Sequence, residues 1–403
     1  MDFGKLILFL FNSYPLFFII TGLYIFKYIN LTQIICGYFL YCLYIQIFSK
    51  VILYYTKTER NDKILKSCPN LLNPNYKPHF FLPFCTFQMI VCGLWKPKKS
   101  KDLKFNVENV NKYGTKLFWA SFSDMKEPLN TQPILILFPG MTGIIDDGYV
   151  QNIIIEGLNK GYNVVIFQMR ILSEDFSLNE TGVFKLYEDI DEAINLINTK
   201  YNKAKIFAIG GSYGANNLVY YLGHINNINK KIHGAVSISN PYDMELCERF
   251  LEDTIFSLLI TFLERENFKK IKYGAENCKN HSFNIELISE CEDMKSYDEE
   301  FSRKIFGYKS ADDYYRNISA LRKIENINIP LLCINAKDDG LTSCRAIPYD
   351  DIRLNENIFL LVADKGAHMC FFSNEKISEL KQWHLKPIFE FLKSCQNLDE
   401  FKF

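Results

Sequence analysis

Five consecutive residues, Gly210-Gly211-Ser212-Tyr213-Gly214, form the pattern Gly-x-Ser-x-Gly directly after the apolar run 206–209. A strand that ends in so tight a turn holds its serine at strained backbone angles, and only small residues fit beside it, here Gly210 and Gly214. The Ser212 hydroxyl then stands exposed at the start of the next helix, where it can act as a nucleophile. Because such a short pattern also occurs by chance, other residues must decide whether Ser212 does chemistry.

A serine hydroxyl is a weak nucleophile, so it needs a histidine base and an acid, in the chain order Ser, Asp or Glu, His. His368 follows a predicted buried strand (357–362), which places it at the carboxyl edge of a sheet. Asp338 and Asp339 follow the predicted strand 330–335. We favour Asp339, because this turn most often has Asp before Gly and an apolar residue, and Asp338 stays open as the alternative. Without Ser212 and His368, both carboxylates would be interpreted as a solvated turn.

Acyl transfer also requires an oxyanion hole, in which two backbone N–H groups stabilise the negative charge that develops on the carbonyl oxygen. One donor is expected at Tyr213, the residue after the nucleophile. The other is expected in the loop 138–143, which reads Phe-Pro-Gly-Met-Thr-Gly after a buried strand. Its glycines allow close backbone approach to a substrate, and the Met141 amide is our candidate donor.

The elements that must position these residues alternate between short strands and helices from about residue 103, which is typical of a mostly parallel sheet flanked by helices. The predicted strands cover 116–122, 134–138, 163–167, 206–209, 234–239, 330–335 and 357–362, and the predicted helices 149–160, 188–200, 216–223 and 375–395. Each candidate site residue then follows the carboxyl end of a strand. The combination predicts an α/β-hydrolase fold, with a helical cap inserted at about 244–322.

On these motifs the chain resembles the membrane-anchored α/β-hydrolase-domain proteins of types 1, 2 and 3 and related esterases, the AB hydrolase 4 family. The resemblance runs from about 76 to 372 and rests on the segments 138–143, 161–167, 210–223, 239–243, 313–315 and 335–339. It implies N-terminal anchor helices, lipid or small ester substrates, and a charge relay of Ser212, Asp339 or Asp338, and His368. Departures include Gln168-Met169-Arg170-Ile171 for the family's Asn-x-Arg-Gly, Ala367 for Gly, and Tyr213 for Met, and they bear on substrate preference.

Two apolar runs precede this region, at 6–26 and 34–55. The first is long enough to cross about 30 Å of hydrocarbon as a helix, and it exceeds the apolar core of a signal peptide. We expect a membrane anchor, either one span followed by an interfacial helix or a hairpin that turns at 27–33. Lysines and Arg60 follow the second run, so the positive-inside rule favours the cytosolic side of an endomembrane for the catalytic domain.

The composition excludes some functions. The formal net charge is +0, with 46 basic and 46 acidic residues, which lacks the basic footprint of a nucleic-acid-binding protein. The 12 cysteines are dispersed, without a Cys-x-x-Cys pair or metal spacing, so we expect buried thiols in a reducing compartment and no structural zinc. The predicted chemistry needs no metal or organic cofactor, and the sequence gives no indication of oligomeric state.

The sequence therefore predicts a membrane anchor (1–60), a connecting segment (61–102) and an α/β-hydrolase domain (103–395). We expect a serine hydrolase that cleaves carboxylic esters, with monoacylglycerols or phospholipid acyl esters as substrates. The alternatives are an acyl-protein thioesterase and a catalytically silent membrane scaffold. An apolar stripe in the cap either flanks an acyl tunnel or packs on the core; its members are Phe250, Leu251, Ile255, Leu258, Leu259, Phe262 and Leu263.

Overall fold

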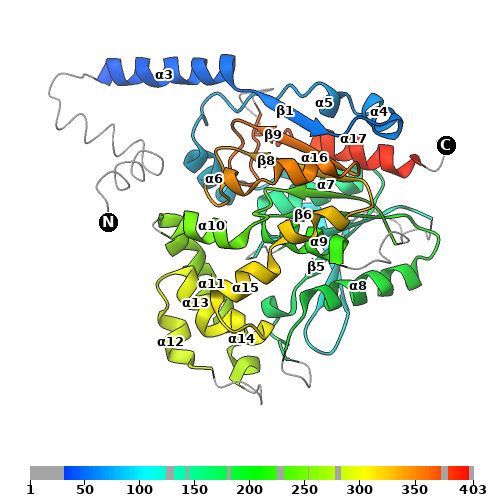
Figure 1. Cartoon of the computed structure of the whole chain (residues 1–403), viewed down its shortest axis with the longest axis vertical. Coiled ribbons are helices and arrows are strands. Elements are labelled where there is room, and N and C mark those ends of the chain that lie inside the picture. Colours follow the sequence, from blue (N-terminus) through cyan, green and yellow to red (C-terminus); the bar gives the residue numbers. More distant parts are fainter. Residues whose placement is uncertain are drawn as a thin grey trace.

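A nine-stranded sheet forms the centre of the molecule (Figure 1). The structure is a computed structural model, and it describes residues 31–123, 131–141, 145–178, 183–224, 231–252, 254–276, 283–373 and 380–398. The strands are β1 (Val51–Tyr55), β2 (Leu103–Asn109), β3 (Lys116–Phe122), β4 (Ile134–Phe138), β5 (Asn163–Gln168), β6 (Ile206–Gly211), β7 (Ile232–Ile238), β8 (Leu331–Ala336) and β9 (Ile358–Ala363). Their order in the sheet is β1-β9-β8-β7-β6-β4-β5-β3-β2.

The inner strands, from β9 to β5, pair in parallel, and β1, β3 and β2 pair antiparallel at the two edges. Every residue of β4, β8 and β9 is buried, as expected for strands that helices cover on both faces. The predicted alternation of strands and helices, and the α/β-hydrolase topology with its mostly parallel sheet, are therefore confirmed.

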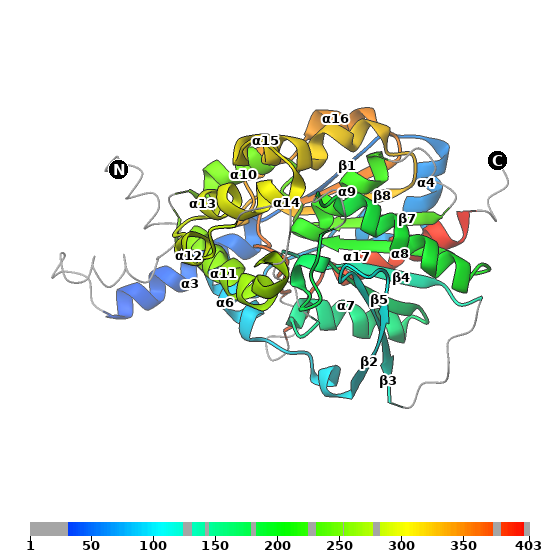
Figure 2. The same cartoon turned by 90° about the horizontal axis from the view of Figure 1, so that it is seen from below.

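Helices cover both faces of this sheet (Figure 2). One face carries α8 (Leu186–Lys200), α9 (Tyr213–His224) and α16 (Tyr349–Leu354). The other face carries α4 (Glu59–Lys66), α5 (Pro69–Leu72), α7 (Gly148–Asn159) and α17 (Leu385–Gln396). Two buried apolar cores result, one on each side of the sheet.

The chain between β7 and β8 forms the predicted helical cap, without a strand among its described residues. Its elements are α10 (Met244–Leu251), α11 (Ile255–Glu276), α12 (Ile285–Glu290), α13 (Met294–Tyr297), a π-helical turn (Asp298–Ser302), α14 (Arg303–Phe306), α15 (Ala311–Ile318) and a 3-10 helix (Ala320–Asn326). The cap lies beyond the carboxyl ends of the strands, below α3 in Figure 1.

The second apolar run differs from the single helix expected over 34–55. Its first part forms α3 (Leu31–Phe48), the one candidate membrane span among the described residues, and its second part forms β1. Residues 51–55 pair antiparallel with β9, and the Lys50 amide donates to Asp364. A short apolar run is compatible with either a strand or a helix. Here it forms a strand, because it can pair with the edge of β9. The first run, 6–26, lies outside the described residues.

Two other expectations need correction. The segment 61–102 is packed against the domain rather than merely connecting, because Ile64, Leu65 and Leu71 of α4 and α5 are fully buried under α17. The final helix begins at Leu385, not at 375. Just before it, Gln382 forms an antiparallel bridge with Phe372, and residues 374–379 lie outside the described residues.

Candidate active site

Ser212 occupies the turn between β6 and α9, with a backbone φ of 55°. This left-handed conformation is strained for a residue with a Cβ atom. A Cβ on Gly214 would lie 2.1 Å from the carbonyl oxygen of Phe138, and one on Gly210 would lie 2.6 Å from the Cα of Ala215. Both flanking positions therefore require glycine, as a nucleophile elbow does.

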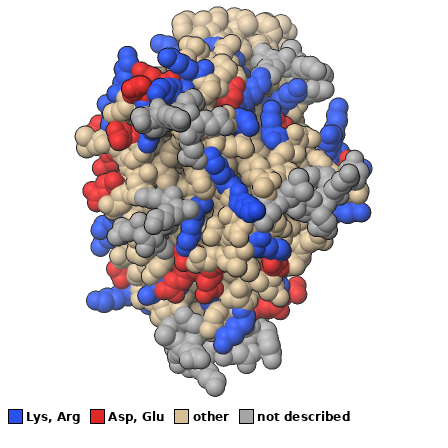
Figure 3. Space-filling view, turned by 90° about the vertical axis from the view of Figure 1, so that its right-hand side faces the viewer, with Lys and Arg blue, Asp and Glu red and all other residues tan. Residues whose placement is uncertain are grey.

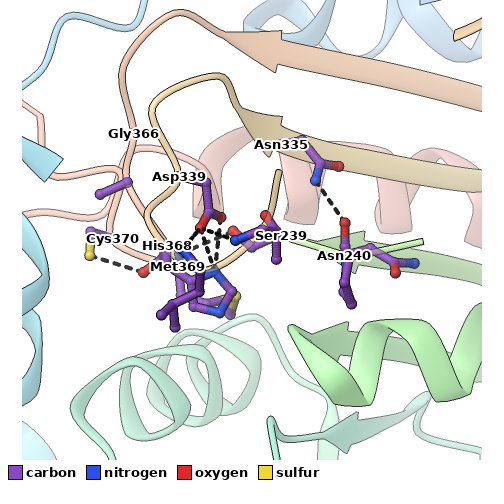
Figure 4. Close-up of polar contacts among 12 residues, drawn as sticks. Ser239, Asn240, Asn335, Asp339, Gly366, His368, Met369 and Cys370 are labelled. Atoms are coloured by element: carbon purple, nitrogen blue, oxygen red, sulfur yellow. Dashed lines mark hydrogen bonds and ion pairs between the residues drawn. The ribbon is translucent and has the colours of Figure 1, made fainter. Parts of the chain in front are cut away.

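His368 lies in the loop after β9 and faces Asp339, which follows β8 (Figure 4). The His368 Nδ1 atom is 3.0 Å from Oδ1 and 2.8 Å from Oδ2 of the Asp339 carboxylate. The same carboxylate accepts hydrogen bonds from the amides of Leu341 and Thr342, at 2.8 and 2.9 Å. These amides fix its orientation toward the imidazole.

Asp338 has a different environment from its neighbour. Its Oδ1 atom accepts hydrogen bonds from the amides of Gly366 and Ala367, at 2.8 and 3.0 Å, and no contact of its carboxylate with the His368 ring is observed. Burial raises the pKa of this carboxyl to about 6, and the ammonium of Lys365 opposes the effect. Of the two candidate acids, Asp339 is thus the one next to the histidine ring.

The loop that carries His368 is held in strained conformations. Ala367, Met369 and Phe371 have positive φ angles of 53°, 62° and 44°. The Met369 amide donates to the Ser239 hydroxyl at 3.1 Å, and Gln382 donates to the Met369 carbonyl oxygen at 2.9 Å (Figure 4). Strain of this kind persists where the surroundings over-determine it, which is common at active sites.

The candidate oxyanion loop lies against the serine. A Cβ on Gly140 would be 3.4 Å from the Cβ of Ser212, so the two backbones are close. The Gly140 amide donates to the Tyr149 hydroxyl at 3.1 Å. That leaves the next amide, at Met141, as the candidate donor from this loop, together with the Tyr213 amide. Residues 142–144 lie outside the described residues.

Ser212 and His368 line the same cavity, which has a volume of about 280 Å³. Gly140, Met141 and Tyr213 line it as well. The rest of the wall is mostly apolar and includes Met89, Cys92, Met244, Leu251, Ile260, Met294, Leu341 and Met369. Ser212, a carboxylate-bound imidazole and two candidate amide donors thus line one apolar cavity.

Residues 133–375, more than half of the chain, match the family described as alpha/beta hydrolase fold. The chain belongs to the alpha/beta hydrolase family.

Three similar relatives of this α/β hydrolase carry names. Embryogenesis-associated protein EMB8 of Picea glauca is 28% identical over 66% of this chain and 59% of the relative. Phospholipase ABHD3 of Bos taurus is 27% identical over 60% of this chain and 59% of the relative. Monoacylglycerol lipase of Saccharomyces cerevisiae is 26% identical over 66% of this chain and 60% of the relative. The match therefore spans less than two thirds of the length of each relative.

We expected the apolar stripe of the cap either to flank an acyl tunnel or to pack on the core, and most of its described residues do neither. Leu251 lines the cavity, but Leu258, Leu259 and Phe262 are more than half exposed and none of them lines it. Phe250 and Leu263 are also exposed, at 43% and 36%. In this α/β hydrolase the residue of α11 that lines the cavity is Ile260. It lies on a different face of the helix from Leu259, because successive residues of a helix point about 100° apart.

Sequence reasoning missed two contributions to the α/β hydrolase site. The Tyr149 hydroxyl accepts the Gly140 amide of the candidate oxyanion loop, and Met89 and Cys92 of α6 (Cys85–Leu94) form part of the cavity wall. The segment that contains α6 has no motif, and only tertiary packing brings it to the serine. His384, another histidine near the end of the chain, is fully buried and its ring lies 5.1 Å from that of Phe371, so it packs in the core. Within the described residues, no group of three or more His, Cys, Asp or Glu side chains could hold a metal.

Proposed function

We propose that this protein is a serine hydrolase that cleaves carboxylic esters of lipids at a membrane surface. The observation that carries the proposal is that His368, whose ring lies 2.8 Å from the Asp339 carboxylate, lines the same apolar cavity as Ser212 at its strained turn. The names of the relatives, a phospholipase and a monoacylglycerol lipase, support a lipid ester as the substrate.

The mechanism follows from these positions. His368 takes the proton of Ser212 as the Ser212 oxygen attacks the ester carbonyl, and the resulting oxyanion binds to the amides of Met141 and Tyr213. Collapse of this intermediate breaks the ester bond, and the alcohol leaves with the proton from His368. Water, deprotonated by His368, then attacks the acyl-enzyme and releases the acid. Asp339 holds the imidazole tautomer and stabilises its charged form.

The outer surface around the cavity supports attachment to a membrane. Helix α6 lines the cavity with Met89 and Cys92 while Ile90 and Leu94 are 55% and 81% exposed. Helix α11 contributes the exposed side chains Leu258, Leu259 and Phe262. The helices α3, α6 and α11 lie on the left-hand side of the molecule in both views (Figures 1 and 2). The helices that line the cavity thus also expose apolar side chains on the outer surface. Such a surface is suited to contact a bilayer, from which a lipid substrate could enter the cavity.

Helix α3 continues this apolar end. Its large side chains at Leu31, Leu40 and Ile47 are 70%, 63% and 67% exposed, whereas one side packs on the chain before α6. There the Tyr41 ring stacks on Phe84 at 5.0 Å. By contrast, the side of the molecule in Figure 3 carries Lys and Arg interspersed with Asp and Glu. We propose that the apolar end meets the bilayer, that one or two helices anchor the chain, and that the catalytic domain lies on the cytosolic side of an endomembrane.

Labelling with a fluorophosphonate tests the hydrolase directly, because this probe reacts with an activated serine. We expect the wild type to be labelled and Ser212→Ala to be unlabelled. A wild type that takes no label, or equal labelling of Ser212→Ala, would leave the catalytically silent scaffold as the better interpretation. A panel of lipid esters and acyl-protein thioesters then separates lipase from thioesterase activity.

A further inference from the structure

A second, much smaller cavity lies between the cap and the segments that follow β4, β5 and β6, and it shares two wall residues, Met141 and Tyr213, with the main cavity. Both residues carry the candidate oxyanion amides. The small cavity has a volume of about 20 Å³, which is room for one water molecule or one hydroxyl group. It therefore adjoins the place where the ester carbonyl would lie.

Two polar side chains of α11, Glu264 and Asn267, line this small cavity. They are 8% and 9% exposed, so both are more than nine-tenths buried. The Oε1 atom of Glu264 and the Nδ2 atom of Asn267 are buried without a hydrogen-bond partner in the described part of the chain. Leaving such buried atoms unpaired is unfavourable, so a polar group from outside the chain is expected to meet them.

The position of this pair along α11 connects it to the main cavity. Ile260, Glu264 and Asn267 are four and three residues apart, so they lie along one face of the helix. Ile260 lines the apolar chamber, and Glu264 and Asn267, on the next two turns, line the small cavity. A substrate bound at Met141, which lines both cavities, would thus have an apolar part beside Ile260 and a polar part near Glu264.

The charge state of the site favours an uncharged hydroxyl over a cationic group. Burial raises the pKa of the Glu264 carboxyl to about 8, and the nearby Asp298 carboxylate adds to the effect. The Asp298 carboxylate itself is occupied by the Tyr315 hydroxyl at 2.7 Å. At neutral pH Glu264 is therefore mostly protonated, and with Asn267 it offers the donor and acceptor that a single hydroxyl group requires.

We propose that Glu264 and Asn267 form a subsite for a free hydroxyl group on the alcohol part of the ester. The preferred substrates are then esters of a polyol that retains a hydroxyl, such as a monoacylated glycerol. This inference rests on the proposed ester hydrolysis at Ser212. The small cavity shares Met141 and Tyr213 with the apolar chamber but not Ile260, so we assign the subsite to the alcohol and the chamber to the acyl chain.

The test compares three decanoyl esters on the full chain: glyceryl decanoate, propyl decanoate, and the decanoate of glycerol dimethyl ether. We expect kcat/KM of the wild type to be about tenfold higher for the glyceryl ester than for the propyl ester, and lowest for the ether, since a methoxyl group exceeds the cavity. Equal kcat/KM for the glyceryl and ether esters would overturn the subsite without any substitution.

Substitutions then test whether Glu264 and Asn267 recognise the hydroxyl group. Glu264→Met and Asn267→Leu keep the size of the side chain and should bring the glyceryl preference close to one, mainly through KM of the glyceryl ester. Glu264→Gln keeps the hydrogen-bonding atoms and should retain the preference, as should Glu266→Gln, a control on the same helix whose partner is Lys269. An unchanged preference in Glu264→Met would mean that the cavity holds only water, and it would overturn the inference.

Fluorophosphonate labelling of each variant separates this inference from the proposed function. If Glu264→Met and Asn267→Leu take the label but still hydrolyse the three esters in the wild-type ratio, the subsite alone is overturned. A wild type that neither takes the label nor hydrolyses any ester overturns the proposed function and the subsite with it.

Discussion

The Oδ1 atom of Asp338 accepts a hydrogen bond of 3.0 Å from the backbone amide of Ala367, the residue that precedes His368. Its neighbour Asp339 instead contacts the imidazole of His368 itself, at 2.8 Å. Two adjacent carboxylates thus support the same loop in different ways: one holds the backbone in its strained conformation, and the other holds the ring. Their substitution should separate a positioning role from the role of a triad acid.

We expect Asp339→Asn to lower kcat on the order of 10⁴-fold, because an amide at this position stabilises the wrong imidazole tautomer. Asp338→Asn should lower kcat by less than about tenfold, because the remaining Oδ1 atom still accepts the amides of Gly366 and Ala367. The measurement is steady-state hydrolysis of a soluble ester.

Asp350→Asn is the matched control, because its side chain is 95% exposed and far from this loop in the chain. It should leave kcat unchanged. A larger loss in Asp338→Asn than in Asp339→Asn would contradict the assignment of Asp339 as the triad acid.

The positions of β3 to β9 along the chain, and the residues that follow them, could be predicted from the sequence, because buried parallel strands are continuous apolar runs with turn residues after them. The pattern around residues 336–341 even favoured Asp339 over Asp338, in agreement with the contact to His368. A strand and the turn that follows it are formed by residues that are neighbours in the sequence, so a sequence pattern is enough to predict them.

The parts that could not be predicted depend on distant contacts. Residues 51–55 became a strand only because the edge of β9 was open to them. Met89 of α6 reached the serine cavity through packing with α7, for which the sequence has no motif. The face of α11 that meets the cavity was also misjudged, since Ile260 lines it and Leu259 is 51% exposed. Helical periodicity shows which residues share one face of a helix, but it does not show which part of the protein that face contacts.

The buried carboxyl of Glu264 should make stability depend on pH. Burial raises its pKa from 4.5 to about 8, so the folded protein binds this proton more tightly than the unfolded chain does. Its contribution to stability is then complete below about pH 4.5 and is lost as the pH rises through about 8, on the order of a few kcal/mol. Burial also raises the pKa of Asp298, to about 6, so its contribution to stability is likewise lost as the pH rises, but at a lower pH.

Thermal unfolding between pH 5 and 9 checks this prediction. The melting temperature of Glu264→Gln should fall less with rising pH than that of the wild type, because Gln carries no titrating proton. The control Glu266→Gln should follow the wild type. Parallel curves for all three proteins would show that Glu264 is not protonated in the folded state.

Adjacent residues of α11 offer a test of the acyl chamber. Ile260 lines the cavity and Leu259 is exposed. We expect Ile260→Gln to raise KM for a long-chain soluble ester on the order of tenfold and to affect a short-chain ester little, since only the long chain reaches this wall. Leu259→Gln should change neither. Equal effects of Ile260→Gln on both esters would exclude an acyl-binding role for this wall.

The exposed residues of the cap should matter only at a membrane. Replacing Leu258, Leu259 and Phe262 together by Gln removes three large apolar side chains, each more than half exposed, from the end of the molecule that also carries α3. We expect binding to phospholipid vesicles to weaken on the order of tenfold, because interfacial binding scales with the apolar area inserted. Hydrolysis of a short soluble ester should stay at the wild-type rate. Leu354→Gln, at an 88% exposed leucine on α16, should not alter vesicle binding. If the triple variant and the Leu354 variant bind vesicles equally well, α11 is not part of the membrane contact.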